Sequence, residues 1–210
     1  MMEQTSSNQV TLCGTVTALP RLSHRNRDED FYIFSLEVQR LSGAADTVNV
    51  LARGKLLENL ELEQGCKKLC IHGEIRSFNN KSGVGAKLVI TVFARELNFT
   101  DEPDENQVQL SGVICKPPTL RKTPMGREIS DLMIAVNRRY GRSDYIPCIA
   151  WGIHARRAAD WAVGTAVSLE GRLQSRSYVK NENGILIEKT AYEVSLTEIG
   201  LLQKEDDGQE

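Results

Sequence analysis

The chain has 210 residues, 40% hydrophobic and 26% charged side chains and a formal net charge of −2. This composition is that of an ordinary globular protein and excludes a fibrous or disordered chain. No apolar run approaches the roughly 18 residues of a membrane-spanning helix, and residues 1–10 are polar, unlike a secretory signal, so we expect a cytoplasmic protein without a membrane partner.

Neither a disulfide framework nor a metal site is indicated by the sequence. The five cysteines form no CxxC pair, and the three histidines are far apart in the chain. We therefore expect free, mostly buried thiols, no metal ion and no cofactor.

The chain contains an internal repeat. Residues 8–14 (NQVTLCG) recur 98 positions later as residues 106–112 (NQVQLSG), and near the end the shift becomes 102 because a late loop of the second copy is longer. Repeats of this length predict two related domains, each large enough to bury a core. The predicted organisation is a domain over residues 8–100, an acidic linker over 101–105, a second domain over 106–202 and a short acidic tail over 203–210.

The mild negative charge of the whole chain conceals two basic domains. Residues 8–100 contain 12 basic and 10 acidic side chains, and residues 106–202 contain 13 and 9, whereas the linker and termini are acidic. A nucleic-acid partner is therefore compatible with the overall composition, because the charge of each domain is what a polyanion meets.

The predicted elements repeat in the same order in both copies. In the first domain, residues 55–60 are expected to form a short helix after the third strand. In the second domain, apolar residues alternate in five segments, and residues 154–161 are alanine-rich and suit a helix between the third and fourth. Five strands with a helix after the third is the order of an OB-fold. We predict an all-β protein of two tandem OB-fold five-stranded barrels, each with one short helix between strands 3 and 4.

The same alternation places a candidate binding face on the second domain. If Ile146, Cys148 and Ala150 point inward, their neighbours on strand 3 point outward. The outward side chains are aromatic or cationic: Tyr145 and Trp151 on strand 3, Arg172, Arg176 and Tyr178 on strand 4, and Arg138, Arg139 and Tyr140 in the loop after strand 2. Rings for bases and cations for phosphates are what single-stranded nucleic acid requires. Duplex binding is less favoured, because no basic recognition helix is visible.

Five short motifs of the second domain occur in order: NxVxLxG (106–112), PxLRxTPxG (118–126), AVNR (135–138), IAWG (149–152) and LEGRL (169–173). Together they resemble the bacterial single-stranded DNA-binding proteins, and the first domain looks like a diverged second member. The resemblance implies stacking aromatics at Tyr140, Tyr145, Trp151 and Tyr178, the residues that alternation selects. Arg121, which lies in the second motif, joins the candidate DNA contacts.

The first domain departs from this pattern. Under the shift of 98, the position of Trp151 is occupied by Arg53 in the first domain. The positions of Tyr140, Tyr145 and Tyr178 are occupied by Ser42, Thr47 and Asn80. Phe78, opposite Arg176, is the one candidate replacement. We therefore expect the second domain to supply most of the DNA affinity and the first to supply assembly surface and phosphate contacts from Arg40, Arg53, Arg76 and Lys81.

The predicted function is to bind and protect single-stranded DNA without strong sequence preference, in replication, recombination or repair. An RNA-binding module and a protein-interaction module built on the same barrels remain alternatives. An enzyme is not expected, because no nucleophile setting, phosphate loop or cluster of carboxylates with histidines is present in the sequence.

Assembly and recruitment follow from the resemblance alone. Members with one barrel usually form tetramers, so a two-barrel chain implies a homodimer with four barrels. The acidic tail lacks the terminal proline and aromatic residue through which family members recruit repair and replication enzymes. Recruitment through this tail is therefore doubtful.

Overall fold

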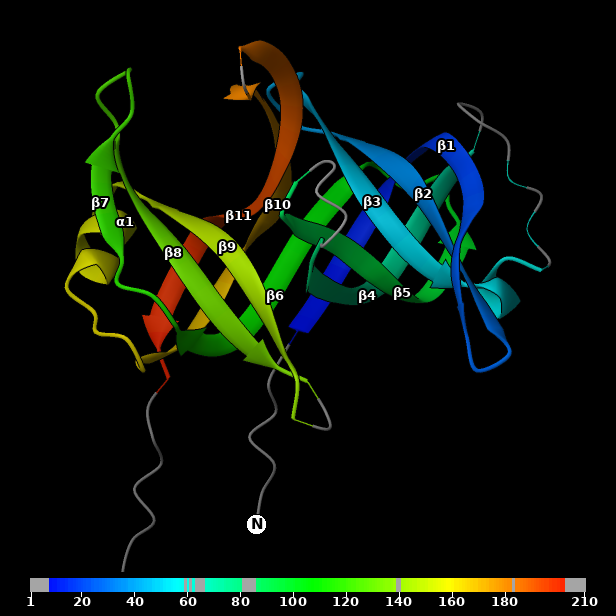
Figure 1. Cartoon of the computed structure of the whole chain (residues 1–210), viewed down its shortest axis with the longest axis horizontal. Coiled ribbons are helices and arrows are strands. Elements are labelled where there is room, and N and C mark those ends of the chain that lie inside the picture. The colour runs from blue at the N-terminus through cyan, green and yellow to red at the C-terminus, as the bar shows by residue number, and fades with distance from the viewer. Residues whose placement is uncertain are drawn as a thin grey trace, which may run out of the picture.

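The computed structural model describes residues 8–58, 60, 62, 67–80, 86–138, 141–182 and 184–202. Two β-barrels lie side by side (Figure 1). The strands of the first are β1 Asn8–Asn26, β2 Glu29–Gln39, β3 Ala45–Arg53, β4 Lys68–Asn79 and β5 Leu88–Phe99. The strands of the second are β6 Glu105–Ile114, β7 Thr119–Lys122, β8 Glu128–Asn137, β9 Ser143–Trp151, β10 Ala166–Glu182 and β11 Ile185–Leu201.

Each barrel closes in the same order. In the first, the sequence of neighbours is β1, β2, β3, β5, β4 and again β1, with β3 and β5 parallel. In the second, it is β6, β8, β9, β11, β10 and again β6, with β9 and β11 parallel. This closure confirms the predicted pair of OB-folds. The short strand β7, which pairs with β8, was not predicted because all four of its residues are exposed and carry no alternation.

The helices differ between the copies. Helix α1, Gly152–Ala159, follows β9 and buries Ala155 and Ala158. In the first barrel the part of the chain that the structure describes has only the 3-10 turn η1, Gly54–Leu56, where a helix over residues 55–60 was expected. Leu56, Leu57 and Leu60 of this segment are partly buried against the core. The segment lacks the alanines that favour a continued helix in α1.

The core is one buried cluster that runs through both barrels. The side chains that alternation places inward in β8, β9 and β10 are buried: Leu132, Ile134, Val136, Ile146, Cys148, Ala150, Val167, Leu169 and Leu173. Ile149, which alternation places outward, is also buried, with 6% of its surface exposed. Period two therefore identifies the inner face correctly, while neighbouring elements cover part of the outer face.

The barrels are joined edge to edge by β1 and β6, which pair antiparallel. Val10 pairs with Val108, its own equivalent under the shift of 98, and Asn8 pairs with Leu110 as Leu12 pairs with Asn106. The two copies are thus related by an approximate twofold axis through the Val10–Val108 pair.

One sequence expectation needs revision. Cys13 and Cys70 pair across β1 and β4 as a disulfide, so the expectation of free thiols is wrong for this pair, although Cys115 and Cys148 are free. The cysteines are 57 residues apart, and only the strand register shows that they meet. In the linker, Lys68 binds the carboxylate of Asp104 at 2.5 Å, so this segment is anchored to the first barrel.

Among the described residues, no helix is long and apolar enough to cross a membrane. Within the same residues, no group of three or more histidine, cysteine or acidic side chains is placed to hold a metal ion.

Candidate nucleic-acid interface

Tyr145 projects from β9 near the junction of the two barrels, and 49% of its surface is exposed. Its backbone N–H donates a hydrogen bond of 2.7 Å to Oγ of Ser77 on β4. Phe78, the next residue of β4, is 50% exposed. The junction therefore brings together two strand segments that each carry an exposed ring.

Trp151 ends β9 and is half-buried. Its indole N–H donates a hydrogen bond of 3.0 Å to Oγ of Ser195 on β11, which fixes the ring edge. The ring lines a hollow of about 550 Å³ together with Lys122, Arg127 and Arg156. Arg156 pairs with Glu128 at 2.5 Å but keeps 65% of its side chain exposed, and Lys122 and Arg127 beside the ring are exposed as well.

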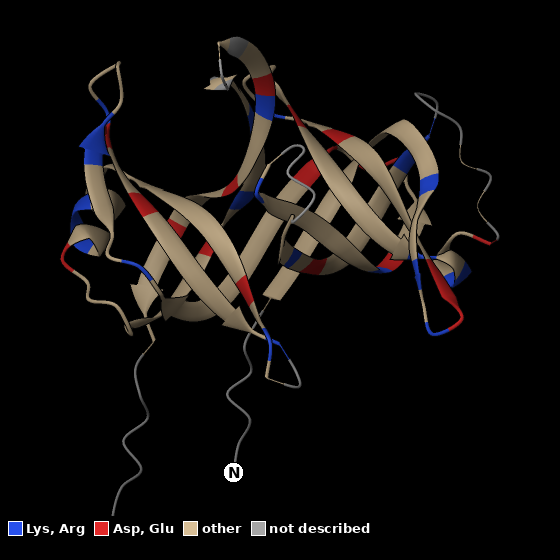
Figure 2. Ribbon diagram, in the orientation of Figure 1, with Lys and Arg blue, Asp and Glu red and all other residues tan. Residues whose placement is uncertain are grey.

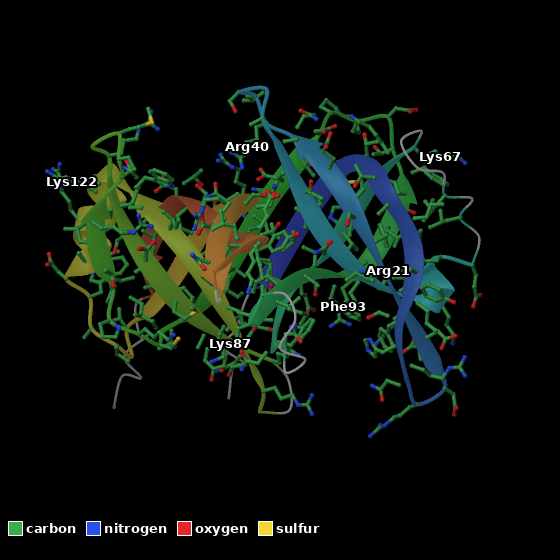
Figure 3. All side chains as sticks on the ribbon, turned by 45° about the horizontal axis from the view of Figure 1, so that its top comes forward. Arg21, Arg40, Lys67, Lys87, Phe93 and Lys122 are labelled. Atoms are coloured by element: carbon green, nitrogen blue, oxygen red, sulfur yellow. A yellow bond between two sulfur atoms is a disulfide. The ribbon has the colours of Figure 1, made fainter. Side chains whose placement is uncertain are left out.

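Lys122 and Arg127 were missed by the sequence prediction, which selected only Arg121 in this region. They flank the turn that joins β7 to β8, where Gly126 adopts a positive φ of 78°. Figure 3 shows Lys122 at the end of the second barrel, and basic residues mark the end of β7 in Figure 2. The Pro-x-Gly turn at residues 124–126 was the available signal, because it predicts a hairpin with basic residues on both arms.

Arg121 itself is paired within the hairpin. Its guanidinium contacts both carboxylate oxygens of Asp131, and this hydrogen bonding raises the pKa of Arg121 above its ordinary value. Its side chain is still 46% exposed. Arg121 is therefore accessible to a ligand, in competition with Asp131.

On β10, Arg176 lies over the ring of Tyr178, with the guanidinium carbon 5.8 Å from the ring centroid. The Arg176 side chain is 57% exposed, and its contact with Glu193 is loose, at 3.9 Å. A cation and a flat ring are thus adjacent on one outward face, as alternation predicted.

Arg138 and Arg76 are engaged by carboxylates of the protein, with 25% and 19% of their side chains exposed. Arg138 binds both oxygens of Asp144, whose side chain is fully buried, and donates to the carbonyl of Ser77 at 3.1 Å. Arg76 reaches the same Asp144 from the first barrel at 3.0 Å and also pairs with Glu74. These two arginines tie the barrels together.

The twofold-related contact involves Arg40. Arg40 binds both oxygens of the buried Asp46, and Asp46 accepts a hydrogen bond of 3.0 Å from the backbone N–H of Ser175. Arg172 lies nearby and is half-buried, and its pKa is lowered by burial and by repulsion from Arg40. The structure therefore gives Arg40 a structural contact and leaves Arg172 only partly accessible.

Arg53 lies on the first barrel at the position equivalent to Trp151. Its side chain is 47% exposed and pairs with Glu29 at 3.4 Å. Its guanidinium lies over the ring of Phe93, a residue the sequence prediction did not select. Arg139, Tyr140 and Lys81, which it did select, lie outside the described residues.

Comparison with known proteins agrees with this geometry. The single-strand binding protein family matches residues 105–202, which span the whole second barrel from β6 to β11. The single-stranded DNA-binding protein B of Bacillus subtilis is 37% identical over 87 residues, which are 38% of this chain and 76% of that protein. The chain belongs to the single-strand binding protein family. It is a family of binding proteins and not of enzymes, in agreement with the sequence prediction.

Other family members match shorter parts of their own length. The single-stranded DNA-binding protein of Halalkalibacterium halodurans is 34% identical over 84 residues, which are 37% of this chain and 50% of that protein. The chain therefore spans about half the length of this relative. In both relatives the match covers less than half of this chain, consistent with one conserved barrel and one diverged barrel.

A solved structure supports the arrangement of the whole chain. The wild-type single-stranded DNA binding protein from Thermus aquaticus superposes with a TM-score of 0.79 over 98% of this chain and 97% of that chain, at 22% identity. At this identity the likeness shows the fold alone, and it extends over both barrels.

Proposed function

We propose that the protein binds single-stranded DNA without strong sequence preference and protects it during replication, recombination or repair. Support comes from membership of the single-strand binding protein family and from relatives that carry this activity in their names. The second barrel supplies most of the affinity in this proposal, because it carries the match to the family.

The observation that carries the proposal is the set of rings on the outer face of the second barrel. Tyr145, Trp151 and Tyr178 come from the two strands, β9 and β10, that flank β11. Stacking contributes about 1–3 kcal/mol per base, so three rings supply most of the energy that a non-specific site needs. Arg176 and the hairpin cations Lys122 and Arg127 supply the phosphate contacts.

The test is a titration followed by tryptophan fluorescence. We expect oligo-dT to quench the emission of Trp151, and added salt to reverse the quenching, because phosphate contacts release counterions. Duplex DNA of equal length is the control and should bind far more weakly. Tighter binding of oligo-U than of oligo-dT would favour an RNA-binding module, and absence of binding to any of these would overturn the proposal.

The division of labour between barrels has its own test. The double substitution Trp151→Ala with Tyr178→Ala should weaken binding of oligo-dT far more than Arg53→Ala with Phe78→Ala, because it removes two stacking rings from the main site. Equal losses would contradict the assignment of most affinity to the second barrel.

For assembly we propose a homodimer with four barrels, in the cytoplasm. The projecting β10–β11 hairpin (Figure 1) offers a surface for it, because Val179 and Leu186 there are 63% and 71% exposed and a second copy could cover both. Light scattering should give twice the chain mass of 23.4 kDa, and a monomeric mass would refute the dimer. The acidic tail, residues 203–210, lies outside the described residues.

A further inference from the structure

The first barrel carries a phenylalanine where the second barrel has a serine. With the shift of 102, Phe93 on β5 corresponds to Ser195 on β11, and the strand registers agree, since Leu51 pairs with Phe93 as Ile149 pairs with Ser195. The first barrel therefore has an outward ring at the junction of its parallel strands, one strand away from the position of Trp151.

The contacts at this junction are exchanged between the two barrels. In the second barrel, the Trp151 indole on β9 donates to the Ser195 hydroxyl on β11 at 3.0 Å. In the first barrel, the Arg53 guanidinium on β3 lies over the Phe93 ring on β5, 5.6 Å from its centroid. The aromatic side chain is thus on the third strand (β9) in the second barrel and on the fifth strand (β5) in the first barrel. The polar side chain occupies the other strand in each case.

Packing holds the Phe93 ring in place. Phe93 is half-buried, and its ring contacts that of Phe31 at 6.3 Å between centroids. Phe31 in turn stacks on His24 at 4.8 Å, with the two rings nearly parallel. A ring already fixed in the free protein loses little conformational entropy when a base stacks on it.

Two cations flank the same ring. Arg95, two residues along β5, lies 4.9 Å from the ring centroid, and Arg53 lies on the neighbouring strand. Their side chains are 46% and 47% exposed, and each pairs with a carboxylate, Glu74 at 2.9 Å and Glu29 at 3.4 Å. Exposed ion pairs of this kind are weak, so a phosphate oxygen can replace the carboxylate.

We infer that Phe93, Arg53 and Arg95 form a stacking subsite on the first barrel for one base of single-stranded DNA (Figure 3 shows Phe93). A base displaces the guanidiniums from the ring face, and the guanidiniums pair with the flanking phosphates. This inference rests on the proposed function and extends it, because the sequence comparison had left Phe78 as the sole candidate ring of the first domain.

Affinity measurements test the subsite. Phe93→Leu keeps apolar volume against Phe31 but removes the flat face, and should weaken oligo-dT binding about tenfold, within the range for one stacked base. Phe93→Tyr keeps the face and should bind as tightly as the unmodified chain. Phe99→Leu is the matched control, because Phe99 is an exposed ring on the same strand, 43% exposed, with Lys67 over it at 4.9 Å.

A fluorescent side chain gives a readout that does not depend on lost affinity. In a Trp151→Phe background, Phe93→Trp places a new indole in the subsite and Phe99→Trp places one outside it. We expect oligo-dT to quench the added emission at position 93 and to leave that at position 99 unchanged.

The outcomes separate the two proposals. Failure of the unmodified chain to bind oligo-dT would overturn the proposed function. Binding by the unmodified chain, together with unchanged affinity of Phe93→Leu or an unquenched indole at position 93, would overturn the subsite and leave the proposed function standing.

Discussion

Arg138 and Arg176 both come from the set of outward arginines, yet their surroundings are opposite. Arg138 is bound by the fully buried Asp144 and by the Ser77 carbonyl of the first barrel. Arg176 is 57% exposed and, among the described residues, contacts the Tyr178 ring and lies loosely beside Glu193. The charge of an arginine is visible in a sequence, but its partner is not.

Arg176→Gln should reduce the salt dependence of DNA binding. Loss of one phosphate contact lowers the slope of log affinity against log salt concentration by about 0.7 for a single strand. The free energy of unfolding should change by less than about 0.5 kcal/mol, because the side chain is exposed. Titrations with oligo-dT at several salt concentrations measure the slope, and an unchanged slope would exclude Arg176 from the phosphate path.

Arg138→Gln should act on stability. It leaves Asp144 buried with Arg76 and the backbone N–H of Ser77 as its partners among the described residues. We expect the free energy of unfolding to fall by about 2–3 kcal/mol, below the roughly 3–5 kcal/mol of a fully broken buried ion pair, because Arg76 remains. Urea unfolding provides the measurement, with Arg176→Gln as control, and equal stability of the two variants would show that the Asp144 contact contributes little.

At the scale of elements, alternation predicted the strands and their inner faces because period two depends only on local sequence. It did not predict β7, whose residues are all exposed. It also did not predict that the β7–β8 hairpin places Lys122 and Arg127 beside Trp151. Phe93 escaped because the equivalent residue in the second copy is a serine, and only the pairing of parallel strands shows what occupies the same place.

Contacts between distant residues set the limit of the sequence prediction. The Cys13–Cys70 disulfide and the Asp144 contacts with the first barrel join residues 57 and 67 or more positions apart. A single sequence contains no record of such pairs, so it assigns no partner to an arginine or a cysteine. The fold was therefore predicted more completely than the candidate site.

Gly171 marks a close approach within the second barrel. A Cβ at this position would lie 2.3 Å from the carbonyl oxygen of Ser195, whose side chain holds the Trp151 indole. Gly171→Ala should therefore lower the free energy of unfolding by about 1–3 kcal/mol, the usual cost of overpacking. Gly200→Ala is the control, because its nearest neighbour would be 3.9 Å away, and thermal melts should show it close to the unmodified chain.

The outcome for Gly171→Ala is decisive for the packing around Ser195. A melting temperature equal to that of Gly200→Ala would mean that β10 and β11 separate readily at their bulge.

At the scale of the whole molecule, both barrels share one sheet and one buried cluster. We expect a single cooperative unfolding transition, because neither barrel can open without exposing strand edges and apolar surface of the other. Calorimetry should give one peak, and Gly171→Ala should shift this peak as a whole. Two peaks, of which only one responds to the substitution, would show that the barrels unfold independently.

The approximate twofold axis through the Val10–Val108 pair relates two halves of one covalent chain. In an assembly of identical subunits, by contrast, every residue occurs on both sides of the axis. In such an assembly a substitution always changes both symmetry-related sites. Here each barrel can change alone. The first barrel therefore has Thr47 at the position equivalent to Tyr145, and Arg53 at the position equivalent to Trp151. The two barrels also cannot dissociate on dilution, because one chain links them, so the two different barrels stay paired at any protein concentration.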